Sequence, residues 1–307
     1  MQISLLLASA TSTALAAITC NVPDNKPSSI PLGCQVCLDS IIISNNSSTW
    51  PTAKLALQEI RGRLVVQAAI PEHLDIPLTV ETLELNGKFP KGTKFKKIVT
   101  GVLEINKVES EGIIFDKMKP LVIKVDRSRV AIQGVSSSTI STLDIHGSTL
   151  ERTVFHNLQK VGSLSMAASH VDIKDLLPSL REAHVVNFSH MQSTCIELPI
   201  TKITGTIRFF FNEQLHSIDF PELTEVKGYF LGEGFATIPA VNIPKLVTTT
   251  AIRMYVKTGS LTIPTQLITP RPSYLLEATP LQYIKYKSPN MQFGTSTTPP
   301  PYCTLIV

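Results

Sequence analysis

The chain of 307 residues is 43% hydrophobic and 17% charged, and its formal net charge is +4. Charged residues fall below the roughly 25% of an average soluble protein, so the composition indicates a well-packed chain and excludes a disordered one. The basic residues are spread along the sequence and form no tract of the kind that nucleic-acid binding needs, so we expect no nucleic-acid partner. An anionic polysaccharide stays open as a partner.

Residues 1–17 have the features of a secretory signal peptide. They contain no charged side chain, include an apolar run at residues 5–7, and end in small residues that suit cleavage after Ala16 or Ala17. The alternative is an N-terminal core strand or helix. The run is too short to span a membrane, and no apolar stretch of spanning length follows it. We therefore expect a secreted, extracellular protein without a transmembrane segment.

The cysteines lie mostly outside the region of repeats. Cysteines at the ends of a secreted repeat protein are expected to form disulfides that seal its caps. The disulfide candidates are Cys20, Cys34, Cys37 and Cys303, with the connectivity left open. We expect Cys303 to bond to a cysteine of the N-terminal segment or to close its own end locally. Cys195 lies amid the repeats and is expected to be a small apolar side chain in the core.

Three sequons, at Asn45, Asn46 and Asn187, are consistent with a secretory route and predict N-glycosylation. The single Cys-x-x-Cys at Cys34 and Cys37 lacks the second pair that a zinc site needs and the βαβ context of a redox motif. The seven histidines are scattered. We therefore expect no metal site and no cofactor.

Strand-like fragments recur through residues 41–264 at intervals of 19 to 23 residues. Residues 82–87 read TLELNG, residues 102–107 read VLEINK and residues 142–147 read TLDIHG. Apolar and polar residues alternate in each fragment, which is the pattern of a strand with one buried face. The predicted inward pairs are Ile41/Ile43, Leu64/Val66, Leu83/Leu85, Leu103/Ile105, Ile123/Val125, Leu143/Ile145, Leu164/Met166, Val186/Phe188, Ile207/Phe209, Tyr229/Leu231 and Ile252/Met254.

A unit of this length cannot bury its own apolar face, whereas stacked units bury one continuous core. The near-constant spacing makes the strands parallel and in register. We therefore predict an all-β fold, a single right-handed parallel β-solenoid with capped ends. An N-terminal cap at residues 18–40 precedes the repeats, and a C-terminal cap with a proline-rich tail follows at residues 265–307. The growing spacing predicts a cross-section that widens toward the C-terminus.

Prolines and glycines mark the expected corners of the coils. Proline cannot donate to a strand ladder, so apolar-Pro-x-apolar fragments predict places where the chain leaves a sheet. These prolines are Pro77, Pro178, Pro199, Pro221 and Pro244. Tight turns into the strands are expected at Gly62, Gly162, Gly205 and Gly228. Weak helical patterns predict a turn or two of helix at residues 53–60 and 174–180.

Residues 220–231, FPELTEVKGYFL, contain an apolar-Pro-x-Leu-x-x-apolar-x-Gly sequence followed by a strand. This sequence resembles the receptor L-domain repeat, which is leucine-rich-repeat-like, and residues 57–66 and 200–209 resemble parts of it. The whole chain resembles fungal cell-wall proteins of the sporulation-specific type, which are secreted, usually GPI-anchored and built from such repeats. The resemblance covers roughly residues 35–265 and implies a non-enzymatic role at a cell surface or wall. The chain departs from that family in having no Ser/Thr-rich stalk and no GPI signal.

The outward residues of the stacked strands are the candidates for function. Adjacent coils stand about 4.8 Å apart, so polar residues at one position of successive strands come close together. The central column is Glu84, Glu104, Lys124, Asp144, Ser165, Asn187, Arg208, Phe230 and Arg253, with Asn86, Asn106, Asp126 and His146 beside it.

Three interpretations of these columns stay open. The first is a solvated face on which Lys124 neutralises Glu104 and Asp144. The second is a binding site for a cell-wall polysaccharide or a surface protein, formed by Glu104, Lys124, Asp126, Asp144 and His146. The third is a polysaccharide-acting β-helix enzyme, lyase or hydrolase, in which Asp126, Asp144 and Lys124 carry the chemistry. We predict a secreted structural or binding protein without catalytic activity.

Overall fold

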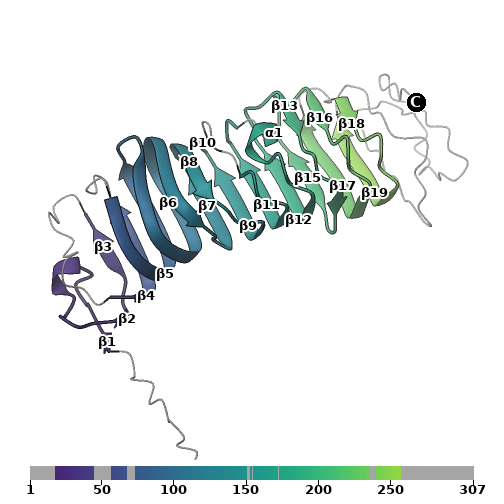
Figure 1. Ribbon diagram of the computed structural model, residues 1–307. Coiled ribbons are helices and arrows are strands. Elements are labelled where there is room, and N and C mark those ends of the chain that lie inside the picture. Colours follow the sequence, from purple (N-terminus) through teal and green to yellow (C-terminus); the bar gives the residue numbers. More distant parts are fainter. Residues whose placement is uncertain are drawn as a thin grey trace, which may run out of the picture.

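The chain forms one elongated stack of parallel β-strands (Figure 1). The computed structural model describes residues 18–44, 57–67, 73–150, 153, 155–171, 173–235 and 240–256. The strands wind in about ten turns. The prediction of an all-β parallel solenoid is confirmed.

One wall of the solenoid, termed the strand face, is a continuous sheet to which each coil adds a strand. Its register follows the sequence spacing, so that Glu84 pairs with Glu104, Glu104 with Lys124, and Lys124 with Asp144. Its strands are β1 (Thr19–Cys20), β2 (Val36–Cys37), β3 (Ile41–Ile43), β4 (Glu59–Gln67), β5 (His73–Lys88), β6 (Thr93–Met118), β7 (Val122–Asp126), β9 (Thr139–His146), β11 (Lys160–Ala167), β12 (Glu182–Ser189), β14 (Lys202–Ile203), β15 (Ile207–Phe210), β17 (Glu225–Phe235) and β19 (Thr248–Val256).

The second wall is less regular. The later part of β6 continues around a corner and pairs with β8 (Arg129–Val135), which in turn pairs with β10 (Thr149–Leu150). Toward the C-terminus a separate three-stranded sheet takes over, made of β13 (Cys195–Glu197), β16 (Ser217–Asp219) and β18 (Ala240–Asn242). The short helices are η1 (Pro27–Ser29) and α1 (Ile173–Leu176). Helix α1 overlaps the helix predicted at 174–180, whereas β4 begins at Glu59, inside the segment where the other helix was expected.

Buried apolar side chains fill the space between the two walls. The predicted inward residues from Ile41 to Phe209 are all buried. The next pair is wrong by one residue: Phe230 is fully buried and pairs with Ile207, while Tyr229 is 40% exposed. The burial pattern of β17 repeats that of β4, in which the first inward residue after the glycine lies two positions beyond it. Leu231 therefore takes the outward position that was assigned to Phe230, between Arg208 and Arg253.

The corner that follows the strand face carries a column of residues with positive φ. Lys107, Arg127, Gly147, Ala168, His190, Phe211 and Gly234 occupy this position in successive coils, with φ between 44° and 75°. Buried serines come directly after several of them and bond to the neighbouring coils. The Oγ of Ser148 accepts a 3.1 Å hydrogen bond from the Ser128 amide and donates to the His146 carbonyl at 2.8 Å. This ladder satisfies backbone groups that the corner removes from the strand pairing.

The prediction of tight turns before the strands is wrong for Gly62, Gly162 and Gly228, which lie inside β4, β11 and β17, where the backbone of the preceding coil approaches closely. A Cβ on Gly162 would lie 2.5 Å from the Ser141 carbonyl oxygen, and one on Gly228 would lie 2.5 Å from that of Gly205. Only glycine fits such an approach. The prolines from Pro178 to Pro244 lie between strands as predicted. Pro77 does not, because it lies inside β5, at a register irregularity between Asp75 and Leu78 where the ladder requires no donor.

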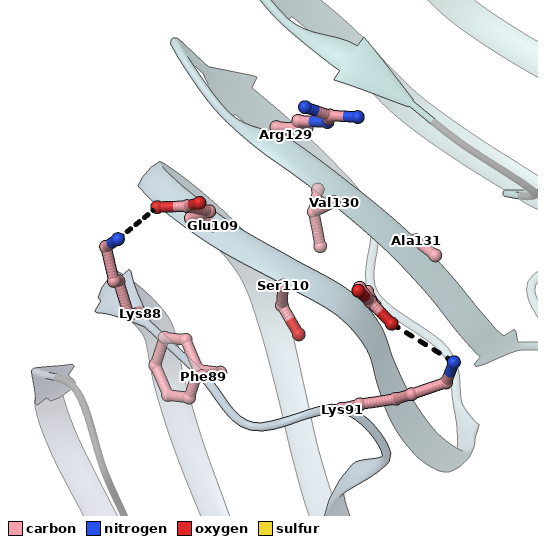
Figure 2. Close-up of a pocket in the computed structure, with 9 residues that line it drawn as sticks. Lys88, Phe89, Lys91, Glu109, Ser110, Arg129, Val130 and Ala131 are labelled. Atoms are coloured by element: carbon pink, nitrogen blue, oxygen red, sulfur yellow. Dashed lines mark hydrogen bonds and ion pairs between the residues drawn. The ribbon is translucent and has the colours of Figure 1, made fainter.

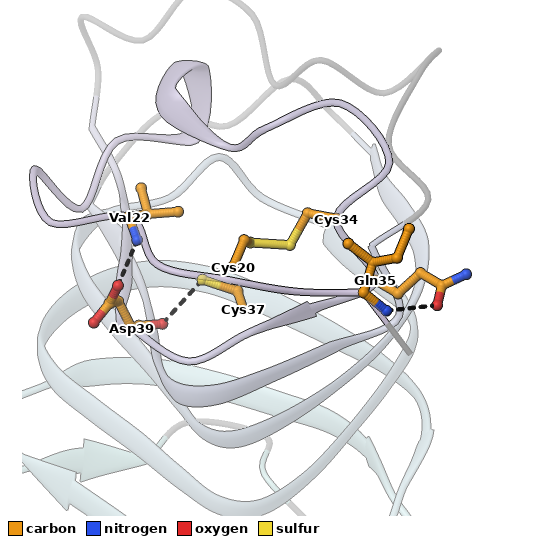
Figure 3. The surroundings of a disulfide bond; sticks show 7 residues. Cys20, Val22, Cys34, Gln35, Cys37 and Asp39 are labelled. Carbon is orange, nitrogen blue, oxygen red and sulfur yellow. Dashed lines mark hydrogen bonds between the residues drawn. A yellow bond between two sulfur atoms is a disulfide. The ribbon is translucent and has the colours of Figure 1, made fainter. Parts of the chain in front are cut away.

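The N-terminal cap contains a Cys20–Cys34 disulfide (Figure 3). Cys37 is a buried free thiol that donates to the Asp39 carbonyl at 3.4 Å, and burial raises its pKa. The expectation of a buried Cys195 is wrong: it is an exposed free thiol, because Ile196 takes the inward position of β13. Cys303, the predicted signal peptide and the predicted proline-rich tail lie outside the described residues.

Candidate functional site

The predicted binding residues surround one hollow of the strand face, termed the strand-face hollow. Its volume is about 370 Å³. Strand register brings the residues together, since Lys124 pairs with Asp144 on the central column and Asp126 pairs with His146 beside it. The lining residues are Glu104, Asn106, Lys124, Val125, Asp126, Asp144, His146, Ser165 and Ala167.

The carboxylate of Glu104 is held by two cationic side chains. Lys124 Nζ lies 3.0 Å from its Oε1, and Arg63 forms an ion pair with its other carboxylate oxygen. Arg63 also pairs with Glu84. Only 15% of the Glu104 side chain is exposed, so its two cationic partners occupy most of its accepting capacity. Sequence reasoning missed Arg63, because a long side chain that reaches diagonally across two coils leaves no sign in the spacing.

Asp126 belongs to a second cluster with His146 and Arg127. Its Oδ1 lies 3.0 Å from His146 Nδ1, and its Oδ2 accepts a 2.9 Å hydrogen bond from Arg127 Nε. Desolvation is the largest single influence and by itself raises the pKa of Asp126. The hydrogen bonds and charges of His146 and Arg127 together outweigh it, so the pKa lies below its usual value. Asp126 is therefore ionised at neutral pH and has no proton to donate.

Asp144 differs from the other carboxylates of the hollow. Among the residues that the structure describes, it takes part in no ion pair and no side-chain hydrogen bond. The expected contact of Lys124 with Glu104 is present, whereas the expected contact with Asp144 is not. The neighbouring Ser165 and Ala167 are small and leave the side of the hollow open to a ligand. Asp144 is thus the acceptor most available to a partner.

Asn187 occupies the predicted outward position, paired with Ser165 on one side and Arg208 on the other. The residue is only partly exposed, and its Oδ1 is buried without a hydrogen-bond partner. Glycosylation here stays a prediction that intact-mass analysis with and without glycosidase can test. Asn45 and Asn46 lie outside the described residues.

Two further hollows lie on the second wall. One, of about 360 Å³, contains the exposed Cys195 together with His170. A larger one, of about 690 Å³, is formed where β5, β6 and β8 lie next to one another, and none of its lining residues was predicted from the sequence. Within the described part of the chain, no three His, Cys, Asp or Glu side chains are placed to hold a metal ion.

No protein-family model, curated protein or solved structure matches this chain. The resemblance to receptor L-domain repeats therefore remains an interpretation of the sequence. Among the described residues, no helix has the length and apolar character needed to cross a membrane.

Proposed function

We propose that the protein is a secreted, non-catalytic component of a cell surface or wall that binds a polysaccharide or a surface protein through the strand-face hollow. The Cys20–Cys34 disulfide supports an oxidising, extracellular location. The resemblance to sporulation-specific wall proteins supports the surface or wall role. The solenoid supplies a rigid and extended platform of the kind that repeat proteins use for binding.

One observation carries the proposal: Asp144 presents an unpaired carboxylate in a hollow where the surrounding charges are paired. Glu104 is held by Arg63 and Lys124, and Asp126 by Arg127 and His146. A hydroxyl group or a cationic side chain of a partner can bond to Asp144 without first breaking an ion pair. A face that is only in contact with solvent does not require one unpaired carboxylate beside two carboxylates that are held in ion pairs.

The test is a screen of the purified protein against polysaccharides and candidate surface proteins, followed by charge reversal. Asp144→Lys and Lys124→Glu are expected to weaken binding by about tenfold or more, because hydrogen bonds to charged groups contribute roughly 1.5–3 kcal/mol. Lys202→Glu is the matched control, since Lys202 forms one cross-coil ion pair with Glu225 at 2.7 Å away from the hollow. Unchanged binding of every partner by both hollow variants would contradict the proposal.

A polysaccharide-acting enzyme is the second candidate, because Asp126 and Asp144 line the same hollow. The lowered pKa of Asp126 suits an electrostatic role and does not suit a general acid. Assays for new reducing ends and for unsaturated lyase products, made with the wild type and Asp126→Asn, separate the two functions. Turnover that Asp126→Asn abolishes would favour the enzyme.

A further inference from the structure

The larger of the two hollows on the second wall, termed the wall groove, is formed by three successive coils (Figure 2). Its volume of about 690 Å³ lies within the range of about 300–1,000 Å³ that is usual for small-molecule sites. The first coil contributes Lys88, Phe89 and Lys91, the second Glu109, Ser110 and Glu111, and the third Arg129, Val130 and Ala131.

Charges of alternating sign surround the wall groove. Lys88 Nζ lies 2.7 Å from Glu109 Oε2, and Lys91 Nζ lies 3.1 Å from Glu111 Oε2, so each ion pair joins two coils. Glu109 in turn pairs in register with Arg129 of the third coil. Figure 2 shows Lys88 and Lys91 at separate ends of the groove, with Phe89 and Ser110 between them. The rim therefore offers donors and acceptors on both sides with nearly balanced charge.

The floor of the wall groove is small, apolar and rigid. Phe89, Val130 and Ala131 are buried, and Ser110 is the buried polar residue between them. Phe89 packs edge-on against Phe95, with ring centroids 6.4 Å apart, and Phe95 stacks on Phe115 at 5.5 Å. Because these rings belong to the core, the floor is held in place before any ligand arrives.

The charged rim and the buried floor of the wall groove together determine which class of ligand can bind. An ammonium group has three donors and a carboxylate has several acceptor sites, so members of a single ion pair keep capacity for further hydrogen bonds. A sugar hydroxyl both donates and accepts, so it can bond to either member of each ion pair on the rim. The three cations and two carboxylates of the rim nearly balance, so a neutral ligand loses no net electrostatic attraction relative to a charged one. We infer that the wall groove binds a neutral oligosaccharide.

The shape of the groove indicates a chain and not a single sugar. Three coils spaced about 4.8 Å apart present repeated rows of polar groups along the solenoid axis. An extended oligosaccharide can place successive residues over successive coils, whereas a monosaccharide would contact only part of the rim. The site lies on a different wall from the strand-face hollow, so the inference does not depend on the function proposed for that hollow.

The experiment is a titration of the full-length protein with short, neutral oligosaccharides of glucose, mannose and N-acetylglucosamine, with a uronic-acid oligomer as the anionic counterpart. The Glu109→Gln/Glu111→Gln double variant keeps the shape of the rim and removes both carboxylates. Binding of the neutral ligand is expected to weaken by about tenfold or more in this variant, since two charged acceptors are lost. Arg129→Ala should also weaken binding.

The matched control is Glu222→Gln. Glu222 forms a similarly exposed cross-coil ion pair with Lys245 at 2.7 Å, outside the wall groove. Melting curves should be alike for all variants, because exposed ion pairs contribute little to stability. Binding lost in the groove variants but kept in Glu222→Gln and Asp144→Lys supports the inference. No binding of any neutral oligosaccharide, binding of the uronic-acid oligomer alone, or neutral binding that only Asp144→Lys weakens would overturn it.

Discussion

The N-terminal and C-terminal halves of the solenoid stack in the same register but build their coils differently. Leu83 and Leu103, partners in adjacent coils, are 20 residues apart, and β6 runs for 26 residues around a corner without interruption. Ile207 and its partner Phe230 are 23 residues apart. In that half the second wall is made of the three-residue strands β13, β16 and β18 (Figure 1). A segment that contains proline follows each of them in the sequence.

On the strand face, the longer coils place larger side chains inward. Phe209 lies 5.5 Å from Phe188 and 5.6 Å from Phe230, measured between ring centroids, and 6.2 Å from Phe220. In the shorter coils the equivalent inward positions hold Leu, Ile and Val. The inward residues of the strand face thus change from aliphatic to aromatic as the coils lengthen, whereas the aromatic rings in the core of the N-terminal half, Phe95 and Phe115, lie away from that face.

The outer surfaces of the two halves differ in where charged side chains gather. In the N-terminal half, charged side chains on adjacent coils surround both the strand-face hollow and the wall groove. On the strand face beyond the hollow, the central column continues with Asn187, Arg208, Leu231 and Arg253, so charged and uncharged residues alternate there and no carboxylate is present. We propose from this comparison that the N-terminal coils carry the binding surfaces, whereas the inward strand-face residues of the C-terminal coils form an aromatic core.

The largest effect is expected from a charge inside the stack. Ile145→Asp should destabilise the protein by several kcal/mol, because Ile145 is fully buried and the carboxylate would have no partner. Its neighbour Asp144 points outward, so Asp144→Ala should cost less than about 1 kcal/mol. Denaturant unfolding of the two variants measures the difference. Equal stabilities would show that the register is wrong by one residue.

The aromatic core of the C-terminal half gives the next largest effect. Phe209→Ala should cost about 3–5 kcal/mol, because it removes a fully buried ring that contacts three others. Phe211 lies two residues away and is half exposed, so Phe211→Ala is the matched control with a small expected cost. A cost for Phe211→Ala as large as that for Phe209→Ala would argue against the aromatic core.

The serine ladder of the N-terminal half should contribute a smaller amount. The Ser128 amide donates a 3.1 Å hydrogen bond to Ser148 Oγ. Ser148→Ala removes this acceptor and leaves the amide without its partner. A buried unsatisfied donor costs about 1–3 kcal/mol. Ser136→Ala is a control at a less buried serine. Thermal unfolding that ranks Ser136→Ala as the more damaging change would contradict the role of the ladder.

The smallest effect concerns pH. Because the pKa of folded Asp126 lies below its usual value of about 3.9, the carboxylate stabilises the fold above that value and loses this contribution as pH falls through the folded pKa. Asp126→Asn should therefore reduce stability at neutral pH by less than about 1 kcal/mol, and the deficit should vanish at strongly acidic pH. A deficit that is independent of pH would show that His146 and Arg127 do not act on Asp126 electrostatically.

The spacing of apolar pairs was sufficient to predict the solenoid, the inward residues from Ile41 to Phe209, and the proximity of Lys124 to Asp144 on the strand face. The failure at Tyr229 has a physical cause, since Gly62, Gly162, Gly205 and Gly228 each precede the first inward residue by two positions. Counting from the glycine would have selected Phe230. Apolar alternation alone was ambiguous there, because Tyr229, Phe230 and Leu231 are all apolar or aromatic.

The remaining features depend on information that is not periodic. Arg63 reaches Glu104 through a long side chain, and the wall groove arises where three coils with different second walls meet. Cys195 is exposed because the short β13 begins with it, and the boundary of a three-residue strand cannot be read from composition. Side-chain reach and local strand boundaries therefore limited the prediction of the site, whereas the fold followed from periodicity.

Carboxyl footprinting with mass spectrometry tests the central claim most directly, because it reports each acidic side chain in the free and the ligand-bound protein. With a partner identified in the screen, we predict reduced labelling of Asp144, and with a neutral oligosaccharide, reduced labelling of Glu109 and Glu111. Glu225 and Glu233 in the C-terminal half should label equally in both states. Unchanged labelling of Asp144, Glu109 and Glu111 together with protection of Glu225 and Glu233 would contradict the assignment of binding to the N-terminal coils.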